Sequence, residues 1–72
     1  MTATEIFLQE LRKARKDFPA VAGTMIGRRV EILALERFEA DCRDKDSDPR
    51  FEADAPKHAR RVIVQHYAAA LA

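Results

Sequence analysis

The chain has 72 residues, a formal net charge of +1, 47% hydrophobic and 35% charged residues, a composition typical of one small folded helical domain rather than a disordered chain. Its single cysteine excludes an internal disulfide and favours a reducing, cytoplasmic setting. No apolar run approaches the roughly 20 residues that span a bilayer, and acidic residues interrupt the apolar N-terminal stretch, so we expect neither a membrane partner nor a secretory signal.

The charge is distributed in three bands along the chain. Residues 1–30 carry a formal charge of +3, residues 31–56 carry −5, and residues 57–72 carry +3. A nucleic-acid-binding domain more often has a basic excess over its whole length, whereas alternating bands favour antiparallel, charge-complementary association. The charge pattern therefore favours a protein partner, which includes a second copy of the chain.

The first predicted helix covers residues 3–17. Thr2 and Glu5 have the spacing of a capping box, with Thr4 as an alternative N-cap. Pro19 disfavours helical geometry at the residue before it, so the helix should end just ahead of that point. One apolar stripe follows the spacing i, i+4, i+7, i+11 and consists of Phe7, Leu11, Ala14 and Phe18.

The second predicted helix is the longest and covers residues 20–43, a segment without internal proline. Its start is open, because Gly23 and Gly27 each cost about 1 kcal/mol relative to alanine inside a helix. The alternative is a later start with Thr24 as the N-cap.

This helix is predicted to be apolar on two sides, with Phe38 apart from both. One side gathers Val21, Met25, Ile32, Leu35 and Cys42. The other gathers Ala22, Ile26, Val30, Leu33 and Ala40. Two short neighbouring helices bury fewer apolar side chains than these, so the sequence predicts that something else covers the remainder.

The third predicted helix covers residues 55–71, with Asp54 as N-cap and Pro56 in the first turn. Its apolar positions have helical spacing and are Ala59, Val62, Ile63, His66, Tyr67, Ala70 and Leu71. The β-branched run in this segment could also form a strand, but the chain has no second comparable run to pair with it.

An acidic linker is predicted over residues 44–54. Asp44, Asp46 and Asp48 match the first three ligand positions of an EF-hand calcium loop. Pro49 stands where that loop needs glycine and Ala55 where it needs glutamate, so the linker interpretation is preferred. An apolar side chain within the linker, that of Phe51, either folds back on the core or anchors a partner.

No catalytic residue, cofactor site or metal site is predicted. His58 and His66 are eight residues apart, too far for the i, i+4 pair of a helical metal site, and Cys42 is distant from both. No nucleophile motif or glycine-rich phosphate loop is present either. The sequence gives no positive indication of an enzyme.

A DNA-binding surface is the alternative prediction. Its residues are Arg12, Lys13, Arg15, Lys16, Arg28 and Arg29. A helix-turn-helix arrangement would place Arg28 and Arg29 on the recognition helix, but side chains that read bases, such as Asn and Gln, are missing there.

We therefore predict an all-α, three-helix domain over residues 1–72, completed by homodimerisation through the second helix. The expected dimer interface consists of Met25, Ile26, Val30, Leu33, Leu35 and Phe38. The expected function is non-enzymatic: binding and modulating another, unidentified protein. Candidate contacts to that partner are Phe51, Arg28, Arg29 and Tyr67. In general style, the chain is similar to small accessory proteins of phages and plasmids.

Overall fold

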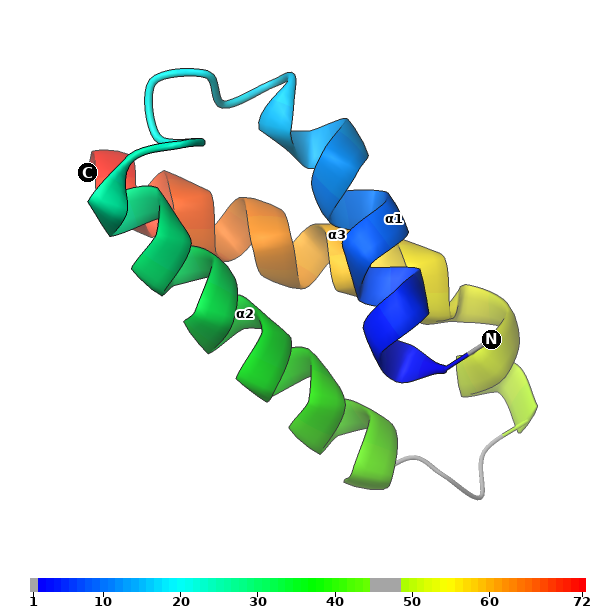
Figure 1. Cartoon of the computed structure of the whole chain (residues 1–72). Helices are drawn as coiled ribbons and strands as arrows, with labels where there is room; N and C mark the ends of the chain where they lie inside the picture. The colour runs from blue at the N-terminus through cyan, green and yellow to red at the C-terminus, as the bar shows by residue number, and fades with distance from the viewer. Residues whose placement is uncertain (1, 45–48) are drawn as a thin grey trace.

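A computed structural model describes the backbone of residues 2–44 and 49–72 and the side chains of residues 2–44 and 54–72. Three α-helices follow one another: α1 (Ala3–Arg15), α2 (Met25–Asp44) and α3 (Pro49–Leu71) (Figure 1). The described residues contain no strand, so the predicted all-α class is confirmed. The molecule is elongated, with principal extents of 36 × 18 × 18 Å.

Helices α1 and α2 both pack on α3, and each contacts α3 far more extensively than the two contact each other. The helices share one apolar core, whose largest fully buried side chains are Phe7, Phe38, Ile63 and Tyr67. Because α1 and α2 touch only sparsely, the side of the molecule where they lie next to each other is the least covered.

Helix α1 forms as its sequence predicts. The Thr2 hydroxyl accepts a hydrogen bond from the backbone N–H of Glu5, and the Glu5 carboxylate accepts one from the backbone N–H of Thr2, which completes the capping box. The predicted stripe is the buried one: Phe7, Leu11 and Ala14 are buried, and Phe18, just after the helix, is half-buried. The helix ends at Arg15, two residues before the predicted end.

Helix α2 begins at Met25, not at residue 20. This start agrees with the alternative prediction, in which Thr24 is the N-cap. The Thr24 hydroxyl accepts from the backbone N–H of Gly27 at 2.9 Å and donates to the carbonyl of Val21 at 2.6 Å. An earlier start fails because Gly23 has a φ of 85°, in the left-handed region that interrupts a right-handed helix.

The first turn of α2 lies against the preceding loop so closely that only glycine fits at one position. A Cβ atom at Gly27 would overlap the carbonyl oxygen of Val21. This close approach brings the loop against the first turn of α2, and Val21 of the loop is buried in the core.

Helix α3 begins at Pro49, six residues before the predicted start, and the acidic segment 44–54 is mostly not a linker. Proline is well tolerated in a first helical turn, where a backbone N–H has no intrahelical acceptor. The sequence offers two such starts, Pro49 and Pro56, and the helix uses the earlier one with Pro56 inside it. Asp46 and Asp48, two of the three aspartates compared with a calcium loop, lie outside the described residues.

Candidate functional site

The buried face of α2 is different from both predicted apolar sides. It consists of Gly27, Glu31, Ala34 and Phe38, at i, i+4, i+7 and i+11, and it packs on α1 and α3. Phe38 is fully buried in the chain's own core, so the prediction that it lies in a dimer interface is wrong. Val30 and Leu35 flank this face and are half-buried against the core.

The large apolar residues that remain on α2 point into solvent. Met25 is 89% exposed, Ile26 67%, Ile32 57% and Leu33 49%. At about 100° per residue these four side chains span an arc of about 120° on the side opposite the core. Arg29 and Glu36, both exposed, lie within the same arc. We call these six residues the outer face of α2.

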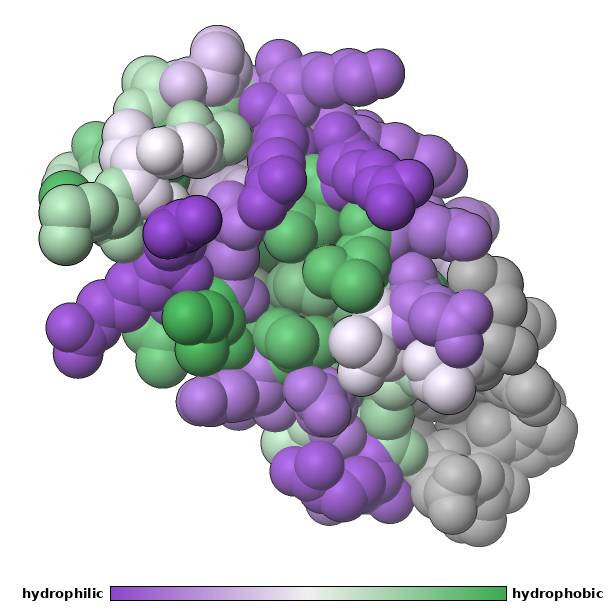
Figure 2. All heavy atoms as spheres, viewed as in Figure 1, coloured by the Kyte–Doolittle hydropathy of each residue, from purple (hydrophilic) through white to green (hydrophobic). Residues whose placement is uncertain are grey.

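A second apolar surface lies between α1 and α2. This α1/α2 groove has a volume of about 400 Å³ and is lined by Phe7, Leu8, Leu11, Ile32 and Leu35, with Arg15, Arg28 and Glu31 also in its wall. Figure 2 shows an apolar patch in the middle of this side of the molecule, bordered by hydrophilic side chains. Ile32 belongs both to this groove and to the outer face, so the two apolar surfaces are continuous.

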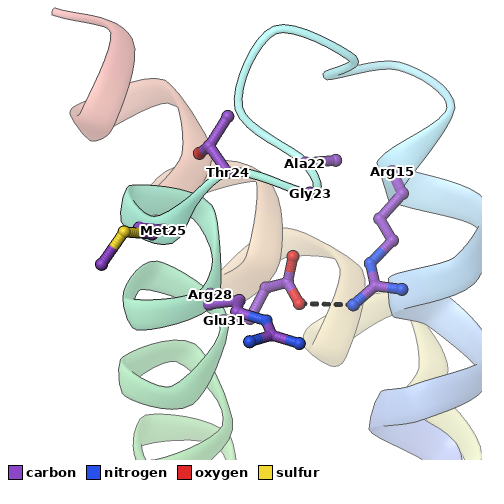
Figure 3. A pocket seen from close by; sticks show the side chains of 7 residues that line it. All are labelled: Arg15, Ala22, Gly23, Thr24, Met25, Arg28 and Glu31. Atoms are coloured by element: carbon purple, nitrogen blue, oxygen red, sulfur yellow. Dashed lines mark hydrogen bonds and ion pairs between the residues drawn. The ribbon is translucent and has the colours of Figure 1, made fainter.

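One carboxylate joins all three helices beside the groove. The Arg15 guanidinium donates to Oε1 of Glu31 at 2.6 Å, and the Tyr67 hydroxyl donates to Oε2 of the same residue at 2.7 Å. Figure 3 shows the first of these contacts at the edge of a second cavity, of about 490 Å³, which the loop before α2 closes on one side. Arg28 also lines this cavity and lies near the same carboxylate.

The charge states of this cluster follow from these contacts. Burial of Glu31 opposes its ionisation, but the hydrogen bonds from Arg15 and Tyr67 outweigh burial and lower its pKa below the ordinary value. Burial and the bond to Glu31 raise the pKa of Tyr67 to about 12. The cluster is therefore an ionised carboxylate with two donors and acts as a structural connection between the helices.

Tyr67 is fully buried, and its ring stacks on Phe18 with centroids 5.1 Å apart. The prediction that it contacts a partner is therefore wrong. Arg28 and Arg29 are exposed, as a partner contact requires. Phe51 lies in the first turns of α3, and its side chain is outside the described part of the structure.

The basic residues lie toward one end of the molecule, where a loop joins the end of α1 to the start of α2 (Figure 1). All six are exposed: Arg12, Lys13, Arg15, Lys16, Arg28 and Arg29. The connection between α1 and α2 covers residues 16–24. A helix-turn-helix motif uses a turn of about 3–4 residues, so this connection is longer than that motif needs.

Histidine and cysteine take structural positions. Nε2 of His58 lies 2.7 Å from Oδ2 of Asp41, and its ring packs at a tilt against Phe38, which ties the middle of α3 to the last turns of α2. Within residues 2–44 and 54–72, no three His, Cys, Asp or Glu side chains cluster as a metal site requires. Burial raises the pKa of the Cys42 thiol, the opposite of the shift that activates a nucleophilic cysteine.

The sequence contains a signal that Glu31 lies on the buried face of α2, but a search for hydrophobic residues alone does not find it. Gly27, Ala34 and Phe38 have helical spacing with Glu31 between them, a stripe of two small residues and one aromatic. Small residues allow helices to approach closely, so such a stripe can mark a packed face even when it contains a carboxylate.

The chain matches no protein-family model, and no curated protein or solved structure is significantly similar to it. In the described part of the chain, no helix combines the length and apolar character needed to cross a membrane.

Proposed function

We propose that the protein is a non-enzymatic helical interaction module that binds and modulates another protein and acts as a homodimer through α2. The observation that carries the proposal is the exposed apolar outer face of α2. Four large aliphatic side chains are exposed on one helix of a 72-residue chain, next to an apolar groove. Contiguous exposed apolar surface of this kind marks an interaction site.

The energy available from the outer face suits reversible association. Fully burying a Leu, Ile or Met side chain contributes about 1.5–3 kcal/mol, so each partly exposed side chain here contributes about 1 kcal/mol. The eight such side chains of a dimer would supply on the order of 8 kcal/mol, against an association cost of about 4–15 kcal/mol. Dimerisation is therefore expected to depend on protein concentration.

A foreign partner has a further surface available. The α1/α2 groove offers Leu8, which is 46% exposed, on the α1 side. Arg28 lines this groove, and Arg29 lies on the adjoining outer face; both are exposed. An amphipathic helix laid into an apolar groove is a common form of recognition and uses anchors at i, i+3 or i+4, and i+7. The single cysteine fits a reducing, cytoplasmic setting for this interaction.

Absolute mass by light scattering, measured over a range of concentrations, tests the proposal. The wild type is expected to reach dimer mass, and Ile26→Asp and Leu33→Asp are expected to remain monomeric, because each buries a carboxylate in the interface. Cys42→Ser is the matched control and should dimerise like the wild type. Circular dichroism would verify that every variant is helical. Dimer mass in both aspartate variants, or monomer mass in the wild type throughout, would contradict the proposal.

DNA binding is the second candidate, and the cluster of six exposed basic residues at one end of the molecule favours it. Titration of duplex DNA at low salt tests this candidate. If it holds, Arg28→Ala combined with Arg29→Ala weakens binding and flattens its dependence on salt. Absence of binding by the wild type at low salt would discard it.

A further inference from the structure

The outer face of α2 is self-complementary in charge as well as apolar. In chain order it presents Met25 and Ile26, then Arg29, then Ile32 and Leu33, then Glu36. The two charged residues lie on opposite sides of the central Ile32–Leu33 pair at equal separation along the helix. A surface with this order matches a copy of itself when the copy is turned end to end.

We infer that a second copy of the chain lies antiparallel across the outer face of α2, about a twofold axis between Ile32 and Leu33. This inference rests on the proposed self-association and names its geometry. In this arrangement Arg29 of each copy is opposite Glu36 of the other, so each dimer has two equivalent ion pairs. Met25 of each copy lies opposite Ala40, a small residue that leaves room for it.

Arg29 and Glu36 are available for such a pair. Both are exposed, and neither has an ion-pair or hydrogen-bond partner among the described side chains. Three other charged residues of α2 are already engaged: Glu31 binds Arg15, and Asp41 contacts Arg37 and His58. The outer face thus holds one cation and one anion that pair with no other side chain of residues 2–44 and 54–72.

Other arrangements of the two helices bring like charges together. A parallel pair in register would put Arg29 against Arg29 and Glu36 against Glu36. An antiparallel pair centred one turn earlier or later would bring two arginines or two glutamates to the axis. Only centring on Ile32 and Leu33 puts opposite charges face to face and apolar side chains at the middle. Antiparallel packing also aligns the helix dipoles favourably.

A second charge match falls on the edge of α2 that borders the groove. Arg28 lies on this edge, and in the antiparallel pair it comes level with residue 37 of the other copy, about 3 Å along the helix from Glu39. Arg28 and Glu39 lie on the same side of their helix at about 100° per residue, and a twofold axis brings like edges together. The exposed arginine beside the Glu31 cluster therefore also faces an acidic residue.

Charge exchange tests the register. Arg29→Glu alone and Glu36→Arg alone each turn two attractive pairs into repulsive ones, so each should weaken the dimerisation Kd about tenfold or more. The double variant carrying both changes restores opposite charges across the axis and should recover affinity to within about threefold of the wild type. Sedimentation equilibrium measures these constants. Lys57→Glu, at an exposed lysine of α3, is the matched control and should leave Kd unchanged.

Cysteine cross-linking provides a second readout, in a Cys42→Ser background. A mixture of Arg29→Cys and Glu36→Cys chains, one of them carrying a mass tag, should form a disulfide heterodimer under mild oxidation, whereas each variant alone should not. The reverse pattern overturns the antiparallel register.

The outcomes separate the two proposals. One outcome is that the wild type dimerises, Ile26→Asp and Leu33→Asp are monomeric, and the charge exchange does not restore affinity. In that case the register is wrong and the proposed function stands. A monomeric wild type overturns both.

Discussion

The inner face of α2 would be expected to be the more apolar one and the outer face the more polar one, but the reverse is found. The inner face, in the core, has one aromatic, one alanine, one glycine and the carboxylate of Glu31. The outer face, in solvent, has Met25, Ile26, Ile32 and Leu33. The more apolar face is thus the one that the fold of a single chain leaves uncovered.

The difference shows that closeness of packing, rather than apolar content, decides which face of α2 is inside. Gly27 and Ala34 let the helix approach the loop and α3, and Phe38 fills the remaining space. Glu31 is accepted in the core because two donors satisfy it. An apolar face left outside by such packing is surface that a partner can cover.

The largest expected effect comes from Phe38. Phe38→Ala empties a fully buried aromatic site and should lower the free energy of unfolding by about 3–5 kcal/mol. Ile26→Ala removes a mostly exposed side chain and should cost about 0.5 kcal/mol or less in the monomer. Urea unfolding of dilute protein compares them. Phe38→Leu serves as a milder variant should the alanine variant not fold, and similar losses at Phe38 and Ile26 would contradict the assignment of the two faces.

The carboxylate cluster on the inner face is the next largest effect. Hydrogen bonds to charged groups contribute about 1.5–3 kcal/mol, so a double-mutant cycle of Glu31→Gln and Tyr67→Phe should give a coupling of about that size. Glu36→Gln on the outer face is the control and should show no coupling to Tyr67→Phe. Additive effects at Glu31 and Tyr67 would mean that the cluster does not hold the helices together.

The same cluster predicts a loss of stability at alkaline pH, partly offset by the nearby Arg15 guanidinium. The folded-state pKa of Tyr67, about 12, lies above the ordinary value of 10.0. Its stabilising contribution is therefore complete below pH 10 and is lost as the pH rises toward 12. The chain has one tyrosine, so its near-ultraviolet phenolate absorbance reports this group directly. Tyr67→Phe should lack this alkaline loss, and a phenol that titrates at its ordinary pKa would refute the contact.

At acid pH the sign is reversed for Glu31. Its pKa is lowered in the folded state, so its contribution is present above the ordinary pKa of 4.5 and is lost as the pH falls below that value. Glu31→Gln should make unfolding less sensitive to pH in this window.

The sequence predicts the buried stripe of α1 and most of that of α3, whose last two predicted members, Ala70 and Leu71, are exposed. Phe7 and Leu11 of α1, and Ile63 of α3, are buried as expected. The inner face of α2 could not be predicted in the same way, since periodicity counts Glu31 as polar and gives Gly27 no weight. The start of α3 was also ambiguous, because Pro49 and Pro56 are both suitable for a first turn.

The smallest effect on the free energy of unfolding is expected for an ion pair on the surface, in contrast to the buried Glu31 cluster. Arg60 and Asp17 join α3 to the end of α1 at 3.3 Å, but both side chains are about half exposed or more. Water screens such a pair, and its contribution is about 0.2–1 kcal/mol. Asp17→Asn should therefore lower the unfolding free energy much less than Glu31→Gln does, although each change removes one carboxylate charge that faces an arginine. If the two losses were equal, burial would add nothing to the Arg15–Glu31 pair, and the inner face would owe its position to the packing of Gly27, Ala34 and Phe38 alone.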